Sequence, residues 1–229
     1  MTMQEAMRQR HTVRRYTDSP IPKETVALLN RRIHENNKTY NLCMKLVCGD
    51  SGGLSGAARL LLARGVNNYF VLAGPDTPDL DEKLGYCGAD LILYAQTLRL
   101  NTWWVGGMYS KKGAEKHLDG QARHGGVRVN GVIAVGFGRT QGAAHKSKTA
   151  GEVSAYEGTA PQWFLDGVEA LLLGPTALNR QAYRVKGKGN TVSIAYGSGH
   201  FSDVDLGIGK YHFELGAGKD NFQWEKGGR

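Results

Sequence analysis

The chain has 229 residues, of which 41% are hydrophobic and 22% are charged, enough apolar content to form a buried core in one domain. It contains no apolar run long enough for a membrane span and no signal-peptide core near its start, so no membrane partner is expected. The formal net charge of +8 indicates anionic ligands, but the basic residues are dispersed without interleaved aromatic residues, which disfavours a nucleic-acid binder.

The first part of the chain alternates predicted helices and strands. A short helix over residues 2–12 carries the sequence Arg10-His-Thr-Val-Arg14 at its end. Pro22 opens a second helix, because proline is tolerated in a first turn whose N–H groups lack helical partners. Further on we expect strands over residues 41–48 and 68–74, with a glycine-rich segment at 49–56 and a helical segment at 57–64 between them.

The central part is dominated by a helix predicted over residues 83–100. Its apolar residues lie nearly all round the helix, which indicates a buried helix. It leads into Asn101-Thr-Trp-Trp-Val-Gly-Gly107, an extended segment that ends in two glycines. A strand over residues 127–137 follows, and then a polar, basic loop over residues 138–151.

The last part predicts a helix, a turn and a hairpin. Pro161 opens the helix and Gly174-Pro175 stops it. Strands at 181–186 and 190–196 enclose a glycine-containing turn, a pattern typical of a hairpin. Residues 206–217 match residues 84–95 at four of twelve positions, at an offset of 122 residues, which suggests a truncated internal repeat.

Cysteine and histidine usage argues against a metal site. The three cysteines, Cys43, Cys48 and Cys87, are an odd number, and neither they nor the seven histidines have metal-ligand spacing. A reduced, cytoplasmic protein is the simplest interpretation.

The chemistry of the N-terminal motif suits a phosphate. Arg10 and Arg14 can pair bidentately with phosphate oxygens, and the hydroxyl of Thr12 can donate one more hydrogen bond. Far along the chain, Pro175-Thr-Ala-Leu-Asn-Arg-Gln181 predicts a tight turn that presents small residues and a planar amide.

Together these motifs resemble the nitroreductase family of FMN-dependent reductases. That family has an Arg-x-Ser/Thr-x-Arg/Lys element near its N-terminus and a Pro-Ser-x-x-Asn-x-Gln turn at the flavin. The turn usually follows the first motif closely and reaches the flavin of the partner subunit, but here it begins at Pro175. This order resembles the family variant in which a second half-copy of the fold supplies the partner's contribution within one chain.

The resemblance implies an α+β fold with a mixed central sheet flanked by helices. It implies one nitroreductase-like domain over residues 1–229, with a first pseudo-half at about 1–155 and a truncated second pseudo-half at about 156–229. FMN would be held non-covalently between the two pseudo-halves. The cofactor-binding residues implied are Arg10, His11, Thr12, Arg14, Gly106, Gly107, Lys146, Lys148, Pro175, Thr176, Ala177 and Asn179.

Each group of residues has an implied role. The arginines and the lysine pair would hold the phosphate and ribityl groups, the glycine pair would approach the flavin N5, and the turn would cover the ring. The sequence departs from the family pattern at several points. Arg99 replaces a helix-ending glycine, Lys148 replaces an arginine and loses its bidentate fork, and Ala182-Tyr183 stands where Pro-Trp is usual.

The implied activity is a ping-pong transfer of reducing equivalents from NADH or NADPH, through FMN, to a nitroaromatic, quinone or similar small-molecule acceptor. Because the flavin carries the redox chemistry, no side chain is expected to act as an acid, base or nucleophile. A non-catalytic flavin- or nucleotide-binding protein on the same fold is the alternative, and a small basic nucleic-acid binder is a third. The chain could be a monomer or a homodimer.

Two other motifs point to different classes of protein. Gly49-Asp-Ser-Gly-Gly53 matches the nucleophile loop of trypsin-like proteases, but only fifty residues precede Ser51, too few for the upstream His and Asp of that fold. The glycine-rich residues 136–142 resemble a dinucleotide-binding turn, but no apolar helix follows them. Neither motif is expected to define the function.

Overall fold

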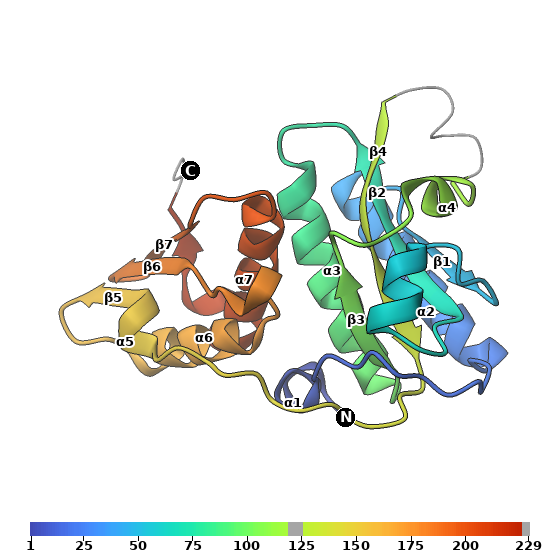
Figure 1. Ribbon diagram of the computed structural model, residues 1–229. Helices are drawn as coiled ribbons and strands as arrows, with labels where there is room; N and C mark the ends of the chain where they lie inside the picture. Colours follow the sequence, from blue (N-terminus) through green and yellow to red (C-terminus); the bar gives the residue numbers. More distant parts are fainter. Residues whose placement is uncertain (119–125, 226–229) are drawn as a thin grey trace. The chain divides into compact units, whose positions relative to one another are not determined.

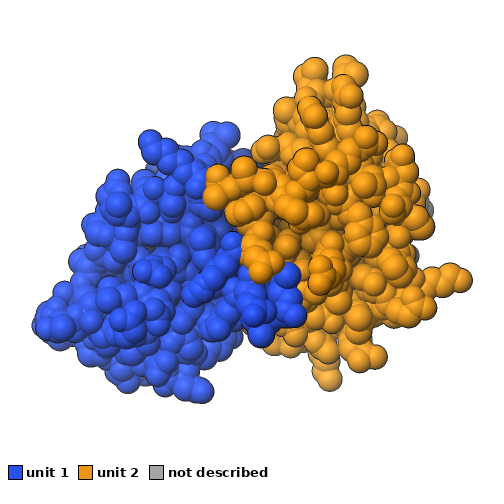
Figure 2. Space-filling model, turned by 90° about the horizontal axis from the view of Figure 1, so that it is seen from below, with its two compact units in different colours: residues 1–8, 81–90, 145–229 blue, residues 9–80, 91–144 orange. Residues whose placement is uncertain are grey.

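The computed structural model describes residues 1–118 and 126–225. The chain forms two compact units, coloured separately in Figure 2. Unit 1 comprises Met1–Arg8, Asp81–Asp90 and His145–Arg229, and unit 2 comprises Gln9–Leu80 and Leu91–Ala144. Among the described residues, no helix is both long and apolar enough to cross a membrane. All three cysteines are free thiols.

Unit 2 is built on a four-stranded antiparallel sheet with the order β1-β2-β4-β3 (Figure 1). Its central strand β2 is buried along almost its whole length, which explains the continuous apolar run of its sequence. The elements of this unit are α2 (Lys23–Tyr40), β1 (Lys45–Cys48), a π-helix (Ala58–Leu62), β2 (Asn68–Pro75), β3 (Asn101–Val105), α4 (Lys111–Glu115) and β4 (Val127–Gly136).

The long helix α3 (Leu80–Thr97) is the buried helix that the sequence predicts. Its end differs from the expected Leu100. Arg99 has a φ of 61°, the left-handed conformation that glycine adopts more easily at such an end. The helix therefore ends where the family's glycine would stand, although an arginine occupies the position.

Unit 1 contains a smaller sheet with the order β5-β6-β7-β8. The β6–β7 pair is the expected antiparallel hairpin, whereas β5 and β8 pair with it in parallel. Helix α6 packs extensively on α7, and Phe164, Val168, Leu171 and Phe213 are buried in this core. The elements are α1 (Met3–Gln9), α5 (Ala150–Val153), β5 (Ser154–Glu157), α6 (Gln162–Leu173), a 3-10 turn (Ala177–Asn179), β6 (Tyr183–Lys188), β7 (Thr191–Tyr196), α7 (Ser202–Ala217), a second 3-10 turn (Lys219–Asn221) and β8 (Gln223–Trp224).

The α+β class is confirmed, and the long elements lie close to their predicted positions. The strands form two sheets, whereas the resemblance implies one central sheet. The strand predicted from residue 41 begins only at Lys45, because Asn41 adopts a left-handed turn that ends α2. The short elements α4, α5, β5 and β8 were not predicted, since two to five residues are too few to show a periodic pattern.

Candidate functional site

The predicted cofactor-binding residues fall into two sets, one in each unit. In unit 2, the N-terminal motif runs as an extended segment beside β3, whereas the sequence had predicted that it lies at the end of a helix. Thr12 forms a parallel bridge with Thr102, and the Val13 N–H donates to the Thr102 carbonyl at 3.1 Å. This pairing fixes the motif along the start of β3.

Arg10 is the most unusual residue of this segment. Only 5% of its surface is exposed, and within the described chain its Nε has no hydrogen-bond partner. Burial lowers the pKa of Arg10 to about 10, so the guanidinium is still charged at neutral pH. The buried hydroxyl of Thr102 also lacks a partner among the described residues. A buried cation without an anion is costly, and a bound phosphate would remove that cost.

The other residues of the motif are more accessible. His11 and Thr12 are half-buried, and Arg14 is exposed. The Arg14 guanidinium lies 5.5 Å from the centre of the Trp103 ring, a cation–π contact that holds it over β3. The segment that pairs with β3 therefore carries two guanidiniums, one of them buried.

The glycine pair lies at the other end of the same strand. Gly106 and Gly107 directly follow β3, and Gly107 is exposed. Gly106 lies four positions after Thr102, which corresponds to about 13 Å of extended chain. Beyond the glycines, the chain pairs with the glycine-rich loop after β1, where the Ser110 N–H donates to the Gly53 carbonyl at 2.8 Å. Strand β3 therefore runs from the N-terminal motif, which pairs with its start, to the glycine pair that follows its end.

In unit 1, the structure brings the lysine pair and the turn together. The Asn179 side chain donates to the Lys146 carbonyl at 2.7 Å. The backbone N–H of Lys148 donates to the Gln181 side-chain oxygen at 2.8 Å, and the Lys148 ammonium donates to the Gln181 carbonyl at 3.0 Å. Lys146 and Lys148 themselves are exposed. Residues 33 positions apart in sequence therefore form one polar group.

One side of the turn is held by hydrogen bonds to Asp205, and the other side is exposed. The Ala177 N–H donates to both carboxylate oxygens of Asp205, at 3.0 and 3.1 Å, and burial raises the pKa of Asp205 to about 6. Pro175, Thr176 and Ala177 are half-buried. Leu178, by contrast, is 95% exposed. The turn thus has a fixed base and presents an apolar side chain to its surroundings.

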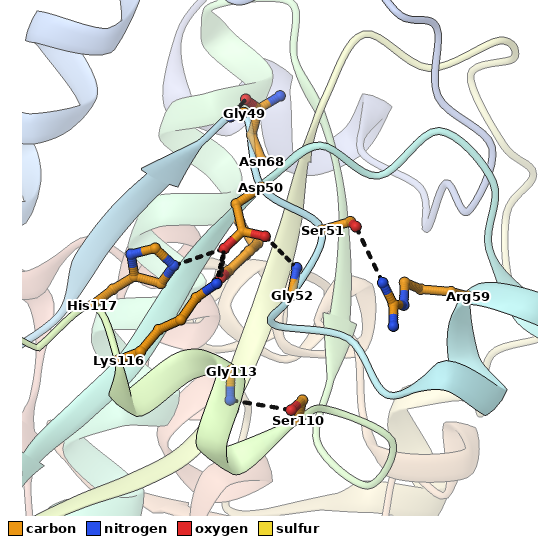
Figure 3. Close-up of polar contacts among 11 residues, drawn as sticks. Gly49, Asp50, Ser51, Gly52, Arg59, Asn68, Ser110, Gly113, Lys116 and His117 are labelled. Carbon is orange, nitrogen blue, oxygen red and sulfur yellow. Dashed lines mark hydrogen bonds and ion pairs between the residues drawn. The ribbon is translucent and has the colours of Figure 1, made fainter.

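A second polar cluster in unit 2 surrounds the protease-like loop (Figure 3). The Asp50 carboxylate accepts from the Lys116 ammonium at 2.8 Å and from the Gly52 N–H at 2.7 Å, and it lies 2.8 Å from His117 Nε2. Its pKa lies well below the usual range, chiefly because of Lys116. The Ser51 hydroxyl accepts from Arg59 at 3.4 Å. The Ser51 hydroxyl thus contacts Arg59, whereas His117 contacts Asp50, and the cluster ties this loop to the residues that follow α4.

Three residues important to these sites had no role assigned from the sequence. Gln181 is the last residue of the quoted turn motif, and this place in the motif is the sequence signal that could have identified it. Asp205 has no such signal, because an aspartate in the first turn of a helix is ordinary. Thr102 became relevant only through its pairing with the N-terminal segment.

Comparison with known proteins gives a consistent family. Residues 2–217 match the family model described as "Putative TM nitroreductase". A crystal structure of a putative nitroreductase from Thermotoga maritima has a TM-score of 0.64 and 21% identity, covering 96% of this chain and 85% of that one. No curated protein matches the chain.

Two further solved structures resemble a smaller part of the chain. A putative nitroreductase in complex with FMN from Desulfovibrio desulfuricans has a TM-score of 0.52 and 18% identity, covering 67% of this chain and 95% of that one. A putative NADH dehydrogenase/NAD(P)H nitroreductase from Bacteroides thetaiotaomicron has a TM-score of 0.50 and 16% identity, with coverages of 66% and 95%. At these identities the likeness concerns the fold.

Proposed function

The chain belongs to the nitroreductase family described as "Putative TM nitroreductase", and on that premise we propose that it is an FMN-dependent oxidoreductase. The proposed reaction is a ping-pong transfer of reducing equivalents from NADH or NADPH to a nitroaromatic, quinone or similar conjugated acceptor. FMN, when bound, supplies the redox chemistry, and the protein supplies binding, orientation and charge.

The buried guanidinium of Arg10 carries this proposal. It is charged and 5% exposed, and its Nε has no partner in the described parts of the chain. Natural proteins rarely keep such a group unless a ligand completes it. The phosphate of FMN has the charge and the oxygen geometry that a guanidinium matches.

The layout of β3 suits the rest of an elongated ligand. The Arg10–Arg14 segment pairs with the start of the strand through Thr12 and Thr102, and Gly106-Gly107 follow the strand's end about 13 Å further on. FMN has its phosphate at one end and its ring at the other. We therefore assign the phosphate to the arginine end, with His11 and Thr12 beside it, and the ring to the glycine end, where backbone N–H groups can stabilise negative charge.

Unit 1 carries the other residues that the family resemblance assigns to the flavin. Following the family pattern, the lysine pair Lys146 and Lys148 is proposed to lie near the phosphate and ribityl groups, and Pro175, Thr176, Ala177 and Asn179 are proposed to cover the ring. The use of NADH or NADPH is consistent with the name of the Bacteroides thetaiotaomicron relative. A cytoplasmic location, suggested by the free thiols, and a monomeric or homodimeric state belong to the same proposal.

The visible absorption spectrum of the freshly purified protein, before and after anaerobic addition of NADPH or NADH, tests the proposal. A yellow protein that bleaches supports a working reductase. A yellow protein that bleaches with neither nucleotide indicates the non-catalytic flavin-binding alternative. A colourless protein that takes up no added FMN contradicts both. Arg10→Glu should fold and bind FMN much more weakly, and unchanged occupancy would contradict the phosphate assignment.

A further inference from the structure

Gln181 is the residue on which the polar contacts of the turn converge. It is 1% exposed, and both ends of its side-chain amide are used. Its oxygen accepts from the Lys148 N–H at 2.8 Å, and its nitrogen donates to the Leu172 carbonyl at the end of α6 at 2.9 Å. Its backbone N–H donates to the Thr176 hydroxyl at 3.1 Å, and its carbonyl accepts from the Lys148 ammonium at 3.0 Å. One residue therefore connects the lysine loop, helix α6 and the turn.

The turn needs such a connection because its backbone is strained. Leu178, Asn179 and Gln181 have φ values of 53°, 54° and 43°, in the left-handed region that residues other than glycine rarely adopt. Each such conformation costs about 1–2 kcal/mol and persists only when surrounding contacts enforce it. Strain of this kind is concentrated at ligand-binding segments, and here it presents the exposed side chain of Leu178.

The two lysines of the loop differ in how they are used. The Lys148 ammonium is bound to the Gln181 carbonyl. No contact within the described chain engages the Lys146 ammonium, although its backbone carbonyl accepts from Asn179. Lys146 is thus available to a ligand, whereas Lys148 is part of the support of the turn.

We propose that Gln181 is a positioning residue that holds the lysine loop and the strained turn in one arrangement, with Lys148 as its support and Lys146 as the cation that contacts the ligand. This inference rests on the proposed flavin-binding function and divides two lysines to which the family pattern gives one role. Because the loop and the turn share Gln181, its loss should loosen both of them together.

Binding of FMN and of riboflavin, which lacks the phosphate, distinguishes these roles. Flavin fluorescence titrations would compare the parent with Gln181→Ala, Lys148→Met and Lys146→Met, and thermal melting would verify that each variant folds. We expect Gln181→Ala to weaken both flavins, FMN by about tenfold or more and riboflavin by a smaller factor, because both the turn and the loop that carries Lys146 lose hydrogen bonds. Lys148→Met should also weaken both flavins. Lys146→Met should weaken FMN about fivefold or more but riboflavin less than about twofold.

The matched control is Gln162→Ala, which removes an exposed glutamine of the same unit whose side chain bonds only within α6. It should bind both flavins like the parent. Parental flavin binding by Gln181→Ala would overturn the proposal. A loss confined to FMN in Lys148→Met would also overturn it, because Lys148 would then be a phosphate ligand.

Hydrogen exchange of the flavin-free protein gives a second test of the role of Gln181 that does not depend on flavin binding. In Gln181→Ala the Lys148 amide should exchange about tenfold faster or more, while amides of the β6–β7 hairpin keep their parental rates. A parental rate at Lys148 would overturn the inference. If the parent binds neither flavin, the proposed function fails, and the exchange arm alone then decides whether Gln181 holds the loop.

Discussion

Gly85 and Gly207 occupy equivalent places in α3 and α7, and each faces the backbone of the other helix. A Cβ at Gly85 would lie 2.1 Å from the Val204 carbonyl oxygen, and a Cβ at Gly207 would lie 2.0 Å from the Glu82 carbonyl oxygen. Glu82 and Val204 are 122 residues apart, as are the two glycines and the first residues of the two helices. The contact is therefore reciprocal, as at an interface about a two-fold axis, while the internal repeat itself stays a prediction.

Alanine at either glycine should destabilise the protein. The added methyl would overlap a backbone oxygen, which cannot rotate away, so the helices must separate. We expect Gly85→Ala and Gly207→Ala each to lower the free energy of unfolding by about 1–3 kcal/mol, measured by urea denaturation. Gly151→Ala is the matched control, because its Cβ would meet nothing within 4 Å. A loss of stability in the control equal to that of the two variants would contradict this explanation.

The double variant tests the reciprocity itself. Because separating the two helices relieves both overlaps at once, Gly85→Ala/Gly207→Ala should cost clearly less than the sum of the single changes. The difference is the interaction energy of a double-mutant cycle. Strict additivity would show that the two contacts are relieved independently and would argue against a single paired interface.

The sequence predicted the long elements, but it did not predict how the segments that carry the candidate site residues are built. Periodic patterns identified α3, α6 and the β6–β7 hairpin within a few residues. The N-terminal motif was expected at a helix end, whereas it pairs with β3. Pairing of this kind depends on residues about 90 positions away, and a local sequence pattern carries no information about them.

The same limit applies to the turn. Its motif was recognised, yet its strain and its dependence on Gln181 and Asp205 were not. Positive φ values at Leu178 and Gln181 contradict the local preferences of these residue types. A conformation that opposes local preference is enforced by tertiary contacts, so it can be seen only once those contacts are known.

Arg10 should stabilise the ligand complex rather than the free protein. Arg10→Met removes an unpaired buried charge, so the flavin-free variant should melt at the same or a higher temperature than the parent. FMN affinity should fall about 10- to 100-fold, the range expected for hydrogen bonds to a charged group. Thermal melting with and without FMN measures both effects. Arg15→Met, at a neighbouring exposed position, should change neither.

The opposite pattern at Arg10 would contradict the phosphate assignment. If Arg10→Met lowers the melting temperature of the flavin-free protein and leaves FMN affinity unchanged, the guanidinium is a structural group with a partner in the protein itself.

Asp205 should make stability depend on pH between about 4 and 6. Burial raises its pKa to about 6 in the folded protein, whereas an unfolded aspartate titrates near 4. The folded state therefore holds a proton that the unfolded chain has lost, and stability falls as the pH rises through this window, by about 2–3 kcal/mol in all. Asp205→Asn does not titrate and keeps an oxygen for the Ala177 N–H.

Urea denaturation at pH 4.5, 5.5 and 7 measures this effect as the difference between Asp205→Asn and the parent. The variant should gain stability relative to the parent as the pH rises, and the difference should level off above pH 6. A difference that is constant over the whole range would show that Asp205 is charged in the folded protein throughout.

The loop Gly49–Gly53 offers a matched pair of changes that separates structural support from nucleophilic chemistry. Asp50 binds Lys116, His117 and the Gly52 N–H, so Asp50→Asn should cost about 1–3 kcal/mol at pH 7. Because the pKa of Asp50 is depressed, this stabilisation is present above the unfolded value near pH 4 and is lost as the pH falls below it. Ser51→Ala removes only a long contact to Arg59 and should change stability by less than about 0.5 kcal/mol. Equal losses in the two variants at pH 7 would contradict the anchoring role of Asp50, and so would a parent that keeps its full advantage over Asp50→Asn at pH 2.5.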